Sequence, residues 1–225
     1  MNTVDAVKHV LLRSGASWVL WLLGASLITT VAISVERWLF YRTREGDLPA
    51  LARRLGAHLA GRDFDAAAQE LGRSRSVAAA IAAAGLELAA AGPAAADKAM
   101  QSAAALERRG LERWLAYLGT LGNNAPFVGL FGTVIGIIGA FEELGRGHGT
   151  AGGAGAAGAA QVASQVVMAS VAEALVATAA GILVALPAVM AFNYFQRRVA
   201  SLLSGTEVLS NLVLAYLSRA PGPRV

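Results

Sequence analysis

One acidic residue lies inside a long apolar stretch of this sequence. Glu173 is the only charged residue between Val166 and Phe192, a run of 27 residues. A carboxylate at bilayer depth costs roughly 3 kcal/mol on insertion scales, so such residues usually face a cavity or a partner. Removal from water favours the neutral carboxyl group. A group that gains and loses a proton within a membrane is suited to proton relay, and we take Glu173 as the first candidate; the alternative is a purely structural, hydrogen-bonded carboxyl.

Two threonines are weaker candidates. Thr133 lies in the uncharged stretch Ala125–Phe141, and Thr178 follows Glu173 by five residues. Five residues correspond to roughly 140° around a helix, so Thr178 and Glu173 need not line the same surface. Either hydroxyl can instead bond back to its own helix. The residues alone leave a pore-lining role for Thr133 and Thr178 open.

Four glycines in the same stretch are spaced like one face of a helix. They are Gly129, Gly132, Gly136 and Gly139. Small residues at this spacing let helix backbones approach closely within a membrane. The segment lacks the preceding strand and the Lys of a phosphate-binding loop. It therefore predicts a helix-packing stripe.

The composition excludes several classes of protein. The chain has 225 residues, of which 56% are apolar and only 15% are charged, against roughly 25% charged residues in soluble domains. There is no Cys, and the three His (His9, His58, His148) are far apart, so we expect no metal site. No nucleophile–base pair or phosphate loop is evident. We therefore expect neither an enzyme nor a cofactor.

Three stretches are apolar enough to cross a bilayer, which needs about 20 helical residues. They are Ala16–Val35, Ala125–Phe141 and Val166–Phe192. The first is longer than a signal-peptide core, and Glu36-Arg37 follows it rather than a small-residue cleavage site. The sequence predicts an all-α membrane protein with three transmembrane helices and long cytoplasmic helical extensions.

The direction of the spans follows from their flanking charges. Residues 42–113 carry eleven basic residues, whereas residues 144–165 carry only Arg146. Cytoplasmic segments are enriched in Lys and Arg, so we expect the N-terminus outside and the C-terminus in the cytoplasm. Nine acidic residues accompany the eleven basic ones, which argues against binding of nucleic acid.

These observations divide the chain into seven segments. The expected segments are 1–15, an outer interfacial segment; 16–41, the first transmembrane helix; 42–113, a cytoplasmic helical segment; 114–143, the second transmembrane helix with its cytoplasmic lead-in; 144–165, a Gly/Ala-rich periplasmic connection; 166–195, the third transmembrane helix; and 196–225, a cytoplasmic C-terminal segment.

Local signals add detail to this division. The spaced leucines Leu48, Leu51, Leu55 and Leu59 indicate an amphipathic helix. Gly92-Pro93 predicts the start of a new helix. We expect that helix to run on into the second span, with a break or bend near Gly122–Pro126. Residues 149–160 are almost entirely Gly and Ala and indicate a flexible connection.

Two stretches resemble the ExbB/TolQ/MotA-like proton-channel family. Leu118–Phe141 contains GLFGTVIGI, and Val171–Asn193 contains AEALVATAAGILVALPA. VERWLF at Val35–Phe40 adds weaker support. The expected topology, three spans with a large segment between the first two, is similar to that of the ExbB and TolQ branch. The subunits of the flagellar stator have four spans. Where the family usually has Pro-Gly, this chain has Ala169-Ser170.

The resemblance implies a bacterial inner-membrane subunit of a proton-driven motor. Such subunits form a pentamer around a single-span ExbD/TolR-like partner whose transmembrane Asp carries the proton, and they contact membrane lipids. The family's polar channel positions correspond here to Thr133, Glu173 and Thr178. The motor would power transport, envelope maintenance or gliding motility.

The residues leave one alternative class open. A non-conducting, homo-oligomeric membrane scaffold would use the same spans and glycines only for assembly. Such a scaffold should tolerate Glu173→Gln, whereas a proton relay should not. The sequence does not distinguish the three pathways within the motor class.

Overall fold

The computed structural model of the protein describes residues 17–148 and 156–219, and within these ranges the secondary structure is entirely helical. Three helical stretches are long and apolar enough to cross a membrane: Ser17–Ala60, Leu115–Glu142 and Val167–Leu217. The predicted all-α class with three potential membrane spans is confirmed. The expected outer interfacial segment, 1–15, lies outside the described residues.

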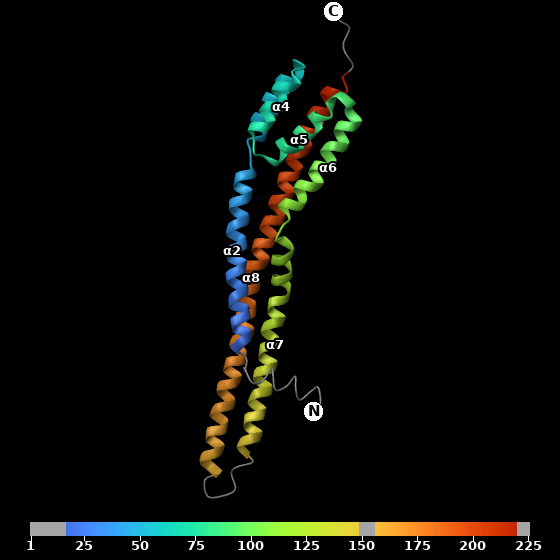
Figure 1. The fold of residues 1–225 in the computed structure, drawn as a ribbon. Coiled ribbons are helices and arrows are strands. Elements are labelled where there is room, and N and C mark those ends of the chain that lie inside the picture. Colours follow the sequence, from blue (N-terminus) through green and yellow to red (C-terminus); the bar gives the residue numbers. More distant parts are fainter. Residues whose placement is uncertain (1–16, 149–155, 220–225) are drawn as a thin grey trace, which may run out of the picture. The chain divides into compact units, whose positions relative to one another are not determined.

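The described helices follow one another with short connections. They are α2 (Ser17–Arg44), α3 (Leu48–Ala60), α4 (Phe64–Arg73), α5 (Val77–Glu87), the short 3₁₀ helix η1 (Ala89–Ala91), α6 (Pro93–Leu111), α7 (Leu115–His148) and α8 (Ala156–Leu217) (Figure 1). The chain divides into two compact units. One comprises Met1–Ile33 and Tyr117–Phe192, and the other comprises Ser34–Ala116 and Asn193–Val225.

The first unit is held together by small and branched side chains from three helices. Its buried cluster contains Val19 and Leu23 of α2, Ala125 of α7, and Val184 and Ala185 of α8. Most of the remaining apolar surface is not covered within the chain. Trp21, for example, is 80% exposed. Large exposed apolar faces of this kind mark surfaces that contact lipid or other proteins.

Three short helices of the second unit are capped at their N-termini by side chains. The side chains of Asp47, Asp63 and Ser76 accept hydrogen bonds, at 3.0, 2.9 and 3.2 Å, from the main-chain N–H groups three residues later. These bonds satisfy donors that a helix leaves free at its start. The amphipathic prediction is confirmed in α3, which buries Leu51, Leu55 and Leu59.

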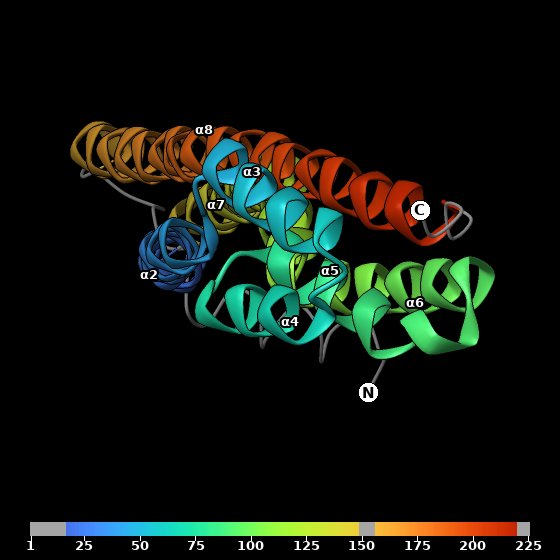
Figure 2. The ribbon, with the colours of Figure 1, turned by 90° about the horizontal axis from the view of Figure 1, so that it is seen from above.

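Helix α6 begins at Pro93, as the Gly92-Pro93 pair predicts. Gly92 adopts a φ of +99°, which glycine reaches without the clash that a Cβ would cause. Helices α5 and α6 then pack closely, since a Cβ placed on Gly85 would lie 2.6 Å from the Met100 side chain. Figure 2 shows α3 and α6 of this unit beside the C-terminal part of α8, and α4 farther from it.

The expected helix from Gly92-Pro93 into the second span is wrong, and so is an interruption of the helix near Gly122–Pro126. Helix α6 ends at Leu111, and α7 begins at Leu115 and continues through Pro126. The turn instead contains Trp114, with a φ of +67°, a value that is uncommon for a bulky residue. Packing explains the continuity of α7: Ala125 is fully buried, and a Cβ on Gly122 would lie 2.5 Å from the Val189 side chain.

Helix α8 is continuous from Ala156 to Leu217, a length of 62 residues. This is about three times the length that spans a bilayer, so α8 must extend beyond the membrane. Pro187 lies inside the helix. Residues 156–160, expected to belong to a flexible connection, are helical; Ala has the highest helix propensity. The remainder of that connection, 149–155, lies outside the described residues.

Candidate functional site

Glu173 is joined to the first apolar helix by a hydrogen bond. The hydroxyl of Ser17, in α2, donates to Oε1 of Glu173, in α8, over 2.9 Å. Both side chains are exposed on the surface of the chain. The carboxyl group is therefore oriented by one neighbouring helix and accessible from outside the chain.

Glu173 lies at the edge of the face that α8 buries. Ala174 and Ala177 are almost completely buried, and so is Val184. Ala177 and Val184 lie on roughly the same face of the helix as Glu173. At about 100° per residue they are within roughly 40° of it, yet Glu173 is exposed and they are not. The small side chains form the contact with α7, and the carboxyl group lies at its border.

Three of the four stripe glycines lie directly against α8. A Cβ placed on Gly129 would lie 2.7 Å from the carbonyl oxygen of Ala177. On Gly132 or Gly136 it would lie 2.7 or 2.6 Å from the Cβ of an α8 alanine, respectively Ala177 and Ala174. Such distances are shorter than carbon atoms tolerate, so only glycine fits without rearrangement. Gly139 has nothing within 4 Å of the same position, so it is not part of this close contact.

Gly132 also determines where α2 lies. The Cβ position of Gly132 is 3.2 Å from the Val19 side chain as well as close to Ala177. Val19 is fully buried. Beside it, the Trp18 ring packs edge-on against Phe131, with ring centroids 6.2 Å apart. These contacts fix the turn of α2 that carries Ser17 next to the turn of α8 that carries Glu173.

The two candidate threonines differ in how their hydroxyls are satisfied. Thr133 donates a 2.7 Å hydrogen bond to the carbonyl oxygen of Leu130, within its own helix. Thr178 has a buried hydroxyl with no hydrogen-bond partner among the residues that the structure describes. Its Cα would lie 3.0 Å from a Cβ on Gly129. Thr178 is therefore part of the tight α7–α8 contact.

The structure does not link the three candidates through hydrogen bonds to one another. Glu173 is bonded to α2, Thr133 to its own helix, and Thr178 lies against α7. Sequence reasoning missed Ser17. The only signal was its position as a hydroxyl residue at the start of an uncharged run, and nothing in one sequence gives the register between α2 and α8.

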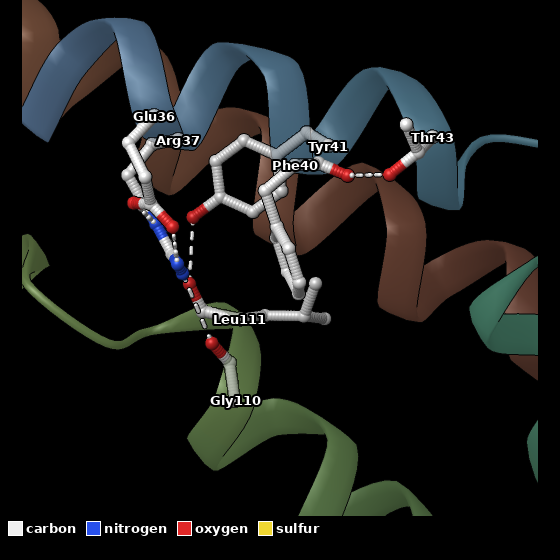
Figure 3. Close-up of polar contacts among 7 residues, drawn as sticks. All are labelled: Glu36, Arg37, Phe40, Tyr41, Thr43, Gly110 and Leu111. Atoms are coloured by element: carbon white, nitrogen blue, oxygen red, sulfur yellow. Dashed lines mark hydrogen bonds and ion pairs between the residues drawn. The ribbon is translucent and has the colours of Figure 1, made fainter.

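A second polar cluster lies where α2 meets the end of α6. Arg37, only 3% exposed, pairs with Glu36 at 2.5 Å and donates to the carbonyl oxygen of Gly110 at 3.2 Å. Tyr41 donates to the carbonyl oxygen of Leu111 at 2.6 Å (Figure 3). Glu36 and Arg37, adjacent in the sequence, thus form a local salt bridge. The bonds to Gly110 and Leu111, which satisfy carbonyls that a helix end leaves free, were not predicted.

The acid–base chemistry that this arrangement offers is that of one carboxyl group. In the described parts of the chain, no group of three or more His, Asp or Glu side chains is placed to hold a metal ion. In the first unit, the segment of α2 from Ser17 to Ile33 has no charged residue, and neither has α7 from Leu118 to Phe141. Glu173 is thus the one ionisable side chain of α8 within the apolar part of this unit.

Comparison with known proteins agrees with this geometry. The model of the MotA/TolQ/ExbB proton channel family matches residues 73–207, more than half of the chain. The biopolymer transport protein ExbB of Xanthomonas campestris pv. campestris strain B100 is 41% identical over 101 residues, which are 45% of this chain and 35% of that protein.

Two proteins of the TolQ type are similar as well. The Tol-Pal system protein TolQ of Pseudomonas aeruginosa is 37% identical over 122 residues, 54% of this chain and 48% of that protein. TolQ of Haemophilus influenzae is 40% identical over 103 residues, 45% of this chain and 40% of that protein. The chain spans less than half the length of each of these relatives. It is a multi-pass membrane protein of a group of energy-transducing channels rather than of enzymes, and it belongs to the MotA/TolQ/ExbB proton channel family.

Proposed function

We propose that this protein is a bacterial inner-membrane subunit of a motor driven by the proton-motive force, and that Glu173 takes part in moving the proton. The observation that carries the proposal is the Glu173 carboxyl group. It lies on an apolar helix, is oriented by Ser17 and is open to a neighbouring molecule. An ionisable side chain within a membrane is by default expected to take part in the protein's function.

The proposed complex is a pentamer around a single-span ExbD/TolR-like partner with a transmembrane Asp. The uncovered apolar faces of the three spans support a multi-chain assembly, since between 22% and 33% of each apolar window is buried within the chain. The similar proteins carry the names biopolymer transport protein and Tol-Pal system protein. We accordingly propose a role in transport, envelope maintenance or gliding motility.

The proposed orientation places the N-terminus in the periplasm and the C-terminus in the cytoplasm. The basic residues of 42–113 and the pair Arg197-Arg198 would then lie on the cytoplasmic side. With this orientation, Ser17 and Glu173 lie toward the periplasmic end of their spans. A proton entering from the periplasm would meet the carboxyl group before it crosses the rest of the bilayer.

The energetics are compatible with a motor. One charge that crosses the membrane releases about 2.3 kcal/mol per 100 mV. This is enough to shift the balance between two packed arrangements of helices that differ little in free energy. Thr133 and Thr178 are proposed to belong to the same path, on the α7 side of α8.

The first experiment is purification of the tagged chain from its native membranes in mild detergent, with mass spectrometry of the proteins that accompany it. We expect a small single-span protein with an intramembrane Asp. The purified complex is then placed in liposomes that contain a pH-sensitive dye, and proton uptake is measured under an imposed potential. Glu173→Gln should abolish uptake.

Glu87→Gln is the matched control, because Glu87 is an exposed carboxyl group at the end of α5, outside the apolar spans. It should leave uptake unchanged. If Glu173→Gln conducts protons as the parent does, the relay proposal is wrong. A homo-oligomer without a partner and without proton uptake would instead support the non-conducting scaffold.

A further inference from the structure

We infer that Ser17 is a positioning residue for Glu173, and that its hydroxyl holds the carboxyl group in place in both protonation states. This inference rests on the proposed function of Glu173. Its geometric basis is the 2.9 Å hydrogen bond between the Ser17 hydroxyl and Oε1 of Glu173. The bond joins two helices through residues that are 156 positions apart in the sequence.

The chemistry of a serine hydroxyl suits this role. A hydroxyl donates one hydrogen bond and also accepts, whereas an ionised carboxylate only accepts and a protonated one can donate. Ser17 can therefore donate to the ionised Glu173 and accept from the neutral form, with only a rotation of its O–H bond. The carboxyl group keeps one partner while its charge changes. A Lys or Arg in this place would instead favour the ionised form alone.

The packing of neighbouring side chains holds Ser17 next to Glu173, so their contact does not depend on chance proximity. Next to it, Val19 is buried against Gly132, and Trp18 packs on Phe131. Gly132 also contacts Ala177, one turn after Glu173 in α8. A single glycine of α7 thus brings the two turns that bear the hydroxyl and the carboxyl group together. Movement of α2 relative to α8 would break the Ser17–Glu173 bond.

Besides Glu173, the titratable residues of this unit include Asp5, Lys8, His9 and Arg13 in the sequence before α2, and residues of α7. The α2 segment Ser17–Ile33 has no charged residue, and the charged residues of α7 within this unit (Glu142, Glu143, Arg146 and, when protonated, His148) are all at its C-terminal end. The phenol of Tyr117 lies at the opposite end of that segment. Among the described side chains, it is a neutral hydroxyl, that of Ser17, which the structure places in hydrogen-bond contact with the Glu173 carboxyl group.

The test uses the complete complex in liposomes. Ser17→Ala should lower proton uptake roughly three- to tenfold, the effect of one lost hydrogen bond of ordinary net strength. Ser17→Thr, which retains the hydroxyl, should restore most of it. Ser26→Ala is the matched control in the same helix, because the Ser26 hydroxyl donates to the carbonyl oxygen of Leu22 and to no other helix. The amount of assembled complex is measured for each variant.

An infrared measurement separates this inference from the proposed function. The carboxylic C=O stretching band of Glu173 is assigned in acid-minus-neutral difference spectra by its loss in Glu173→Gln. Ser17→Ala should move the band to higher frequency, as expected for a carboxyl group that has lost a hydrogen bond, and Ser17→Thr should return it.

Each outcome is decisive. If Ser17→Ala matches Ser26→Ala in both proton uptake and band position, the role of Ser17 is refuted. Loss of proton uptake in Glu173→Gln would still support the relay in that case. If the band moves but uptake does not, the hydrogen bond exists and has no part in proton transfer. If Glu173→Gln conducts normally, both the proposed function and this inference fail.

Discussion

The phenol of Tyr41 donates a 2.6 Å hydrogen bond to the main-chain carbonyl oxygen of Leu111, the last residue of α6. Arg37, one turn earlier in α2, donates to the preceding carbonyl, that of Gly110. Side chains of α2 thus satisfy two carbonyls that α6 cannot satisfy itself (Figure 3). This contact directly precedes the turn at Trp114, so it fixes where the helix α6 ends.

Tyr41→Phe should lower the free energy of unfolding by about 1–2 kcal/mol, because it leaves a buried carbonyl without its donor. The ring is retained, so its packing against Phe195 is unaffected. Thermal unfolding in mild detergent, followed by circular dichroism, measures the change. Tyr194→Phe is the control, since Tyr194 is 51% exposed; equal stability of the two variants would contradict the role of the Tyr41 hydroxyl.

Gly129→Ala should destabilise the first unit by roughly 1–3 kcal/mol, the usual cost of overpacking. The new methyl group would lie 2.7 Å from a carbonyl oxygen and 3.0 Å from a Cα of α8, and main-chain atoms cannot rotate away as a side chain can. Gly139→Ala has open space and should be neutral or slightly stabilising. The same unfolding assay compares them, and equal loss in both would show that the close contact does not decide stability.

Local patterns in the sequence predicted much of this structure. The three potential spans follow from run length, and the start of α6 follows from Gly92-Pro93, because each of these signals is contained in a short stretch of chain. The turn at Trp114 was not predictable. It contains no Gly or Pro, whereas Pro126, the stronger local signal, is accommodated inside α7.

The site was predicted only in part for a similar reason. Glu173 stands out because a charge in an apolar run is rare. Its partner Ser17, however, depends on how α2 and α8 are aligned across Gly132. The spacing of the four glycines groups Gly139 with the other three, yet the Cβ position of Gly139 faces open space. Spacing gives the face of a helix, and only tertiary structure gives the length over which that face is in contact.

The proposed orientation of the chain can be tested with single cysteines, because the natural sequence has none. Thr150→Cys, between the second and third spans, should react with a membrane-impermeant maleimide added to cells whose outer membrane is permeabilised. Glu87→Cys, at an exposed position at the end of α5, should react only after the inner membrane is opened. The opposite pattern would reverse the topology, and with it the side from which a proton first meets Glu173.

Thr178 allows stability and proton transfer to be separated. Its hydroxyl is buried without a partner among the described residues, and such a group costs roughly 1–3 kcal/mol in desolvation. Thr178→Val keeps the shape and removes the unpaired oxygen, so it should leave the protein equally stable or stabilise it. If the hydroxyl serves the proton path, as proposed, proton uptake in liposomes should nevertheless fall.

Thr133→Val is the comparison for that experiment. The Thr133 hydroxyl is already bonded to the Leu130 carbonyl oxygen. That oxygen can also accept from a main-chain N–H group of the same helix, so loss of the Thr133 hydroxyl should change stability little. A stabilised Thr178→Val that conducts fully would show that the hydroxyl is not used. A stabilised variant with reduced uptake would show that the fold tolerates an unsatisfied buried group at Thr178 because proton transfer requires it.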